Sequence, residues 1–341
     1  MKTLNEPIYS QALMDERVWG GNRLGKMFGK PIPPGRIIGE SWELSDRPGM
    51  QTLVSGGHWE GQPLRALMEQ AGQALLGPAL CALKPARFPL LVKFIDSGEP
   101  LSVQVHPDDN AARRFNDRGK TECWVVIHVE PGARIIRGLR PGTTRETYQE
   151  AVARNRVADV LNEFSPRVGE VIALPPGMVH AMGAGVVVAE IQQNSDLTFR
   201  IYDYNRPGLD GKPRQLHLAE ALEAIRFTHP GDEFTCDLTT NTVAAPTGRE
   251  QSGVASELLL DGRFFNLERH TLAPLSRLAL PSLPEAPRVL MALAGSGMLG
   301  GRSLPAGQTV LLPASMPRVE LCAGPAESLT VLVSMPKAAA C

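Results

Sequence analysis

The residues best suited to chemistry lie in the stretch GEVIALPPGMVH, from Gly169 to His180. Gly169 permits a tight turn before the apolar run 171–174, and the Pro-x-Gly turn at 175–177 ends that run. His180 then begins the next strand in a fixed orientation. A strand, turn and strand in this order would aim one imidazole at the interior of a small β-barrel.

Further candidate metal ligands lie upstream of this histidine. The segment LSVQVHPDD alternates as a strand does, so Gln104 and His106 are expected to project from one face. A second strand is expected over 122–129, and its first residue, Glu122, is a carboxylate at the start of an apolar run. With His180, these residues offer two imidazole nitrogens, one carboxylate and one amide oxygen. Such a donor set suits zinc or another borderline divalent metal, with room left for water or substrate.

The spacing of the glycine, the Pro-x-Gly turn and the histidine resembles the second half of the cupin signature. A wider set of motifs resembles the type I mannose-6-phosphate isomerases (phosphomannose isomerases) in their short bacterial form. Each motif is short, but their number and order over most of residues 19–218 make the joint match specific. The motifs are WGG (19–21), GESWELS (39–45), PLLVKFID (89–96), LSVQVHPDD (101–109), GKTECW (119–124), PPGMVHA (175–181) and EIQQNSDLTFRIYDYNR (190–206).

The resemblance implies a cofactor and an activity. In that family the metal is zinc, and the four ligands fall here on Gln104, His106, Glu122 and His180, which predicts one zinc ion per chain. The implied reaction interconverts mannose 6-phosphate and fructose 6-phosphate through a cis-enediol. One residue moves a proton between C1 and C2 while zinc polarises an adjacent oxygen.

Arg200 is the candidate for contact with the substrate. It lies in the strand-like run TFRIYDY, where a buried guanidinium is costly unless it is paired. The resemblance makes it a catalytic, substrate-contacting arginine, whose geometry suits a phosphate or a developing enediolate. The alternative is a structural ion pair with Asp196 or Asp203.

Three more residues are expected in the active site. Lys120 lies two residues before Glu122, so the two side chains are expected to share a strand face. The resemblance makes Lys120 an active-site and substrate-binding residue and Glu190 an acidic one, and either could be the proton shuttle. Ser102 matches a serine associated with phosphate binding in the family.

Composition shows neither disorder nor a membrane span. The chain has 341 residues, 35 basic and 36 acidic side chains and a net charge of −1, which gives no electrostatic reason to expect nucleic acid or an anionic membrane as partner. Its five cysteines form no CxxC pair and no signal peptide is evident, so we expect reduced thiols in the cytoplasm. The expected partner is a small-molecule sugar phosphate, and the expected assembly is a monomer or homodimer.

The expected fold is mainly β, a cupin-type double-stranded β-helix (jelly roll), because 33 glycines and 29 prolines punctuate short apolar runs. We expect two jelly-roll domains. The first, 1–230, binds the metal and carries a small helical insertion around 143–164, which opens on a capping box of Thr143 and Glu146. The second, 231–341, is expected to hold no metal. Helices are also expected over 63–76 and 217–227.

Two other function classes stay open at this point. A cupin iron dioxygenase would normally offer His-x-His, whereas Gln104 replaces one imidazole here and Glu122 lies far beyond His106. A non-catalytic sugar-binding or regulatory cupin is the other class, and the intact Lys120, Glu190 and Arg200 count against it. Within the isomerases, the physiological substrate could also be a different aldose phosphate.

Overall fold

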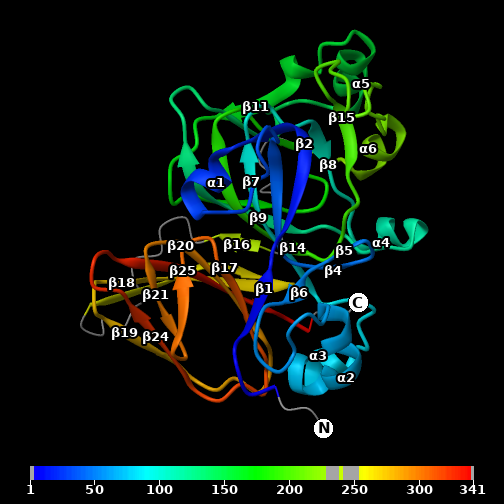
Figure 1. Cartoon of the computed structure of the whole chain (residues 1–341). Coiled ribbons are helices and arrows are strands. Elements are labelled where there is room, and N and C mark those ends of the chain that lie inside the picture. Colours follow the sequence, from blue (N-terminus) through cyan, green and yellow to red (C-terminus); the bar gives the residue numbers. More distant parts are fainter. Residues whose placement is uncertain (1–3, 228–237, 241–252, 339–341) are drawn as a thin grey trace.

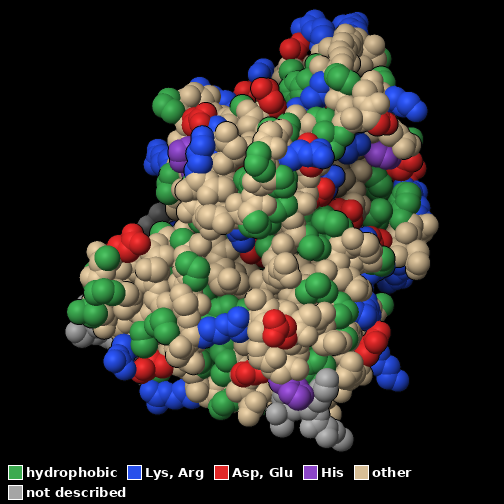
Figure 2. All heavy atoms as spheres, viewed as in Figure 1, with side chains coloured by type: hydrophobic (Ala, Val, Ile, Leu, Met, Phe, Trp, Pro, Cys, Tyr) green, Lys and Arg blue, Asp and Glu red, His purple; other side chains and the backbone are tan. Residues whose placement is uncertain are grey.

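The computed structural model describes residues 4–227, 238–240 and 253–338. Antiparallel strands outweigh helices among these residues, which confirms the expected mainly β class. Among the described helices, none combines the length and the hydropathy that a bilayer-spanning helix needs. Figure 2 shows basic and acidic side chains interspersed over one face of the molecule, as the near-zero net charge leads one to expect.

Two sheets form the barrel that holds the sequence-predicted site, in the upper part of Figure 1. The six-stranded sheet has the order β12-β9-β14-β7-β3-β2, and the five-stranded sheet has the order β11-β10-β13-β8-β15. Apolar side chains such as Ile95, Trp124 and Met182 form a core within this barrel. The strands are β2 (Leu13–Gly21), β3 (Ile38–Leu44), β7 (Leu90–Ser97), β8 (Val103–Val105), β9 (Glu122–Val129), β10 (Ile135–Leu139), β11 (Leu161–Phe164), β12 (Val171–Leu174), β13 (His180–Met182), β14 (Val186–Gln193) and β15 (Phe199–Tyr202).

The strands of the last third form a second pair of sheets. An eight-stranded sheet has the order β16-β17-β18-β25-β20-β23-β1-β6, and a four-stranded sheet has the order β19-β24-β21-β22. The first of these sheets contains two N-terminal strands, since β1 pairs with β23 and with β6. The strands are β1 (Ile8–Gln11), β6 (Leu53–Val54), β16 (Leu238–Thr240), β17 (Val254–Gly262), β18 (Phe265–Leu272), β19 (Arg277–Leu280), β20 (Arg288–Ala294), β21 (Ser296–Leu299), β22 (Arg302–Pro305), β23 (Thr309–Leu312), β24 (Val319–Ala323) and β25 (Leu329–Pro336). A separate hairpin joins β4 (Asp46–Arg47) to β5 (Met50–Gln51).

The six-stranded and eight-stranded sheets share one hydrophobic core. Phe94 of β7 and Val125 of β9 belong to the same cluster of buried side chains as Leu267 of β18 and Leu332 of β25. The apolar back of the sheet that carries the site is therefore covered by strands that lie far along the chain. The predicted boundary between domains, at residues 230 and 231, lies outside the described residues and stays a prediction.

The helices agree with most of the sequence-based expectations. Helix α2 and helix α6 confirm the segments expected at 63–76 and 217–227. The capping box was predicted one residue too early, because Thr144 and Thr147, rather than Thr143 and Glu146, exchange side-chain and backbone hydrogen bonds there. The helices are α1 (Arg23–Phe28), α2 (Leu64–Leu76), α3 (Pro78–Ala82), α4 (Asp109–Ala112), α5 (Arg145–Ala153), α6 (Leu218–Ala224) and the 3-10 helices at Arg113–Phe115 and Val157–Val160.

The predicted helical insertion around 143–164 is helical only up to Val160, because its last four residues form β11 and pair with β10.

Cys81, Cys123 and Cys322 are free thiols, as expected. The other two cysteines, Cys236 and Cys341, lie outside the described residues.

The shared core predicts that a cavity in the C-terminal strands destabilises the barrel of the site. Leu332 has no exposed surface, so Leu332→Ala should lower the free energy of unfolding by about 2–5 kcal/mol. All four tryptophans lie before residue 125, so their fluorescence during urea unfolding reports on the N-terminal strands. The matched surface variant is Leu209→Ala, at a side chain that is 61% exposed. It should change the free energy of unfolding by less than about 0.5 kcal/mol. An unchanged fluorescence transition in Leu332→Ala would show that the two halves unfold separately.

Candidate active site

Three of the predicted metal ligands converge at one end of the barrel. His106 follows β8, Glu122 begins β9 and His180 begins β13, and one ligand atom of each lies within 4.8 Å of the others. The Nε2 atom of His180 is 3.3 Å from Oε1 of Glu122, and Nε2 of His106 is 3.6 Å from Oε2. All three side chains are buried. In the described part of the chain, they form the one such group of histidine, cysteine and acidic residues.

The two histidines of this trio each bond a backbone carbonyl through Nδ1, while Nε2 lies near the carboxylate of Glu122. Nδ1 of His106 lies 2.7 Å from the carbonyl oxygen of Leu197, and Nδ1 of His180 lies 2.9 Å from that of Met178. A proton on each Nδ1 leaves the Nε2 lone pair free, which is the form of histidine that binds metals. The buried atoms Oε1 of Glu122 and Nε2 of His180 have no hydrogen-bond partner among the described residues. Because unpaired buried polar atoms are costly, the donor set fits a divalent metal ion.

Gln104, the fourth predicted ligand, lies next to the trio. It is the direct neighbour of His180 across the β8 and β13 pair, and its side chain lines the pocket at the site. Strand β8 is shorter than the alternation suggested and ends at Val105, so His106 stands just beyond the strand. Whether the amide of Gln104 ligates a metal stays a prediction.

Lys120 places a cation against the same trio. Its Nζ atom forms an ion pair with Glu122 and lies 3.1 Å from Nε2 of His106. Burial would lower the pKa of Lys120, but Glu122 and then Glu190 overcome this and raise it. Burial and the charge of Lys120 lower the pKa of His106 to about 3, so this imidazole stays neutral. The expectation that Lys120 and Glu122 share a face is confirmed.

Glu190 belongs to a row of side chains that crosses four neighbouring strands. In this row Trp42, Lys93, Glu190 and Trp124 stand opposite one another on β3, β7, β14 and β9. The indole of Trp124 donates a hydrogen bond of 2.9 Å to Oε1 of Glu190, while Lys93 lies 3.7 Å from Oε2 and 4.2 Å from the ring centre of Trp42. Burial raises the pKa of Glu190, which favours a carboxyl that can exchange a proton.

Three further charged residues line the pocket and were not expected there from the sequence, namely Lys93, Glu40 and Arg17. Glu40 accepts hydrogen bonds from Lys93 and Arg17, each at 3.2 Å, and from the indole of Trp42 at 2.8 Å. Burial would raise the pKa of Glu40, yet Lys93 and Arg17 together lower it to about 2. A lysine in the middle of the apolar run LLVKFI was the clue available in the sequence, because a buried ammonium needs a partner.

Arg200 lies on the opposite side of the pocket, with Ser102 and Arg214. Its Nε donates to the hydroxyl of Ser102 at 3.3 Å, and its Nη1 donates to the carbonyl of Gln215 at 2.8 Å. The alternative role of Arg200 was an ion pair with Asp196 or Asp203. Among the described residues, Arg200 forms no ion pair with either. Asp203 instead binds Arg206 at 2.8 Å and Arg214 at 3.3 Å. Burial and the neighbouring Arg214 lower the pKa of Arg200 to about 10.

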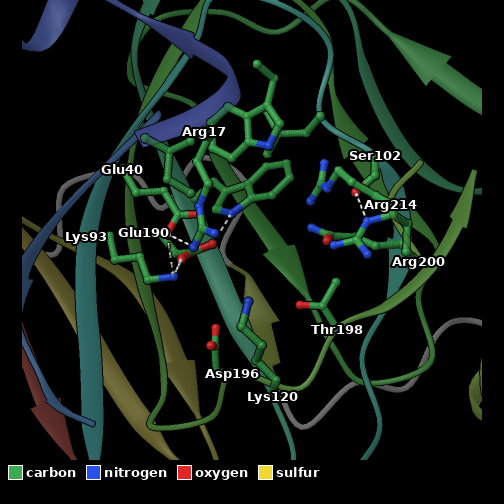
Figure 3. A pocket seen from close by; sticks show the side chains of 15 residues that line it. Arg17, Glu40, Lys93, Ser102, Lys120, Glu190, Asp196, Thr198, Arg200 and Arg214 are labelled. Carbon is green, nitrogen blue, oxygen red and sulfur yellow. Dashed lines mark hydrogen bonds and ion pairs between the residues drawn. The ribbon is translucent and has the colours of Figure 1, made fainter. Parts of the chain in front are cut away.

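The pocket between these two sides has a surplus of positive charge. Figure 3 shows Glu40, Lys93 and Glu190 on one side and Ser102, Arg200 and Arg214 on the other, with Lys120 between them. The cavity measures about 220 Å³. Its charged lining comprises five cations, Arg17, Lys93, Lys120, Arg200 and Arg214, and three acids, Glu40, Glu190 and Asp196. Such a lining suits a small polar anion.

Comparisons with known proteins agree with this site. The family model for the phosphomannose isomerase type I catalytic domain matches residues 9–122. The chain is 32% identical over 296 residues to the mannose-6-phosphate isomerase of Streptococcus mutans serotype c (strain ATCC 700610 / UA159), covering 86% of this chain and 87% of that protein. It is 39% identical over 246 residues to mannose-6-phosphate isomerase ManA of Bacillus subtilis (strain 168), covering 70% and 76%. The crystal structure of the mannose 6-phosphate isomerase from Bacillus subtilis matches with a TM-score of 0.84 and 29% identity, over 97% of this chain and 99% of that one.

The fold and the site thus define an enzyme, an aldose–ketose isomerase built on a cupin-type β-barrel. The chain belongs to the family of the type I mannose-6-phosphate isomerases, also called phosphomannose isomerases. The resemblance seen in the sequence motifs is confirmed by relatives that align over most of the chain.

The ligand trio predicts that one histidine decides whether a divalent metal is retained. Loss of a residue that merely orients a ligand costs about 10- to 100-fold in metal affinity. Removing the ligand itself in His180→Ala should therefore weaken metal binding by more than about 100-fold. Elemental analysis of dialysed protein would measure bound metal per chain, with His58→Ala, an exposed histidine, as the control. A His180→Ala variant that retained as much metal as the His58→Ala control would contradict this assignment.

Proposed function

We propose that this chain is a zinc-dependent isomerase that interconverts mannose 6-phosphate and fructose 6-phosphate through a cis-enediol. The observation that carries the proposal is the arrangement of the pocket. A buried trio of metal ligands lies beside it, a carboxyl with a raised pKa stands on one wall, and two arginines stand on the other. The relatives' names support the substrate, and the surplus of cations in the pocket supports a phosphorylated one.

We assign the metal to His106, Glu122 and His180, with Gln104 as the fourth ligand. The set of two neutral imidazoles, one carboxylate and one amide oxygen suits zinc. When bound, zinc would supply a Lewis acid that polarises an oxygen of the substrate. Lys120 would then lose part of its attraction to Glu122, because that carboxylate would be engaged by the metal, and its ammonium would be free to contact substrate oxygens.

The phosphate end of the substrate is assigned to the wall formed by Ser102, Arg200 and Arg214. Two guanidinium groups line this wall, and burial lowers the pKa of both. Arg214 lowers the pKa of Arg200 further, and an anion between the two side chains would stabilise this arrangement. Asp203 neutralises only part of this charge, and it positions Arg214 through the 3.3 Å contact. The reacting carbons of the sugar would then lie toward the opposite wall, where Glu190 stands.

Proton transfer between C1 and C2 is assigned to Glu190, with Lys120 as the alternative shuttle. Oε2 of Glu190 has no hydrogen-bond partner among the described residues, although Oε1 is held by Trp124. One oxygen therefore orients the carboxyl while the other is available for a proton. The raised pKa of Glu190 brings the acid and base forms closer in energy near neutral pH, which a residue that both takes and returns a proton requires.

The proposed reaction predicts activity that depends on the metal. In a coupled assay, purified protein should convert mannose 6-phosphate to fructose 6-phosphate, lose activity on chelation and regain it with added zinc. An oxygen electrode run with ferrous ion serves as the control for a dioxygenase and should show no consumption. A folded, zinc-loaded sample without isomerase activity would contradict the proposal for this substrate and favour a binding role or another aldose phosphate.

The role of Glu190 predicts a loss of turnover in Glu190→Gln. The amide keeps an acceptor for the indole of Trp124 but cannot take up a proton, so kcat should fall by about 100- to 10,000-fold while KM changes little. The matched control is Glu163→Gln, at an exposed glutamate of β11, and it should retain the activity. Unaltered turnover in Glu190→Gln would assign the proton shuttle to Lys120 instead.

A further inference from the structure

A second cleft shares no lining residue with the catalytic pocket. It measures about 250 Å³. Its walls come from the segment before β7, from the 3-10 helix at 113–115 and the loop that follows it, and from the loop after β14. The lining residues that matter are Arg87, Arg113, Asp117, Arg118 and Asn194.

The cleft carries unbalanced positive charge. Its one acid, Asp117, is already occupied, because Arg47 binds it at 2.8 Å and Arg87 at 3.3 Å. Burial would raise the pKa of Asp117, but these arginines, Arg47 foremost, lower it, so it stays ionised. Arg113 and Arg118 are exposed and form no ion pair within the described part of the chain. Two guanidinium groups are thus available to an anion that enters the cleft.

Asn194 offers the cleft a hydrogen-bond acceptor that has no donor of its own among the residues that the structure describes. Its side chain is buried, at 2% exposure, and its amide nitrogen donates to the carbonyl of Phe88 at 2.8 Å. Its Oδ1 atom is also buried, and no described residue donates to it. A buried acceptor left unpaired costs free energy, and a hydroxyl of a ligand in the cleft would remove that cost.

We propose that this cleft is a second, non-catalytic binding site for a small phosphorylated polyol or sugar. The phosphate would bind Arg113 and Arg118, and a hydroxyl would donate to Oδ1 of Asn194. Arg118 lies two residues before Lys120, and Asn194 lies two residues before Asp196, which both line the catalytic pocket. A ligand in the cleft therefore contacts the two chain segments that place these side chains. The inference is independent of the proposed reaction.

The test uses sorbitol 6-phosphate, which has hydroxyls and a phosphate but no carbonyl to isomerise. Its binding is measured by calorimetry on the full chain with Arg200→Ala, a change that weakens binding in the catalytic pocket. We expect a site that survives Arg200→Ala and weakens by tenfold or more when Arg113→Ala and Arg118→Ala are added, since hydrogen bonds between charged groups are being lost. Inorganic phosphate, which carries no polyol chain to reach Asn194, should bind more weakly.

The control replaces two arginines that already have partners. Arg154 binds Glu150, and Arg156 binds Asp159, both at the surface beyond the cleft, so Arg154→Ala with Arg156→Ala should leave the affinity unchanged. Binding that is lost entirely in Arg200→Ala, or that ignores the substitutions at 113 and 118, would overturn the proposal. Equal affinity for inorganic phosphate would overturn the role of Asn194. Isomerase activity of the unmodified chain tests the proposed function separately.

Discussion

The alternation of side chains along the six-stranded sheet is the constraint on which the rest of the structure depends. Successive residues of a strand point to opposite faces, so β7 presents Lys93 to the pocket while its neighbour Phe94 enters the shared core. On β14, Glu190 and Ile191 divide in the same way. A shift of one residue in the pairing of either strand would bury its charge in the apolar core. The register that holds the fold together therefore also sets the geometry of the site.

Buried charges on the inner face are tolerated because each has a neighbour of opposite sign or a nearby dipole. Lys93 lies within 3.7 Å of both Glu40 and Glu190. Glu122 has no exposed surface, and Lys120 and two imidazoles surround it, so its pKa is held well below the usual range despite burial. Removing one partner of such a set leaves a buried charge unpaired, which costs about 3–5 kcal/mol. The polar face is thus a network rather than a collection of independent residues.

The metal ligands could be predicted from the sequence because local rules place them. The turn at Gly177 and the strand starts at Glu122 and His180 are set by nearby glycines, prolines and apolar runs, and strands β9 and β12 begin and end where expected. Lys93 and Glu40 could not be assigned in the same way. Their partnership depends on β3 and β7 being neighbours in the sheet. The pairing of β1 with β23 joins Tyr9 to Val310, and no local pattern encodes a contact over that distance in the chain.

The C-terminal strands complete the site without entering it. Among the residues described from 253 onward, none lines the catalytic pocket, but Leu267 and Leu332 cover the back of the sheet that carries Glu122 and Glu190. Arg269 of β18 also connects the two halves directly, because it donates a hydrogen bond of 3.0 Å to the carbonyl of Gly169, just before β12. A sheet with ionised side chains on one face must bury its other face to remain folded, since burial of apolar surface is the main stabilising contribution to folding. The position of the catalytic groups therefore depends on packing supplied by the end of the chain.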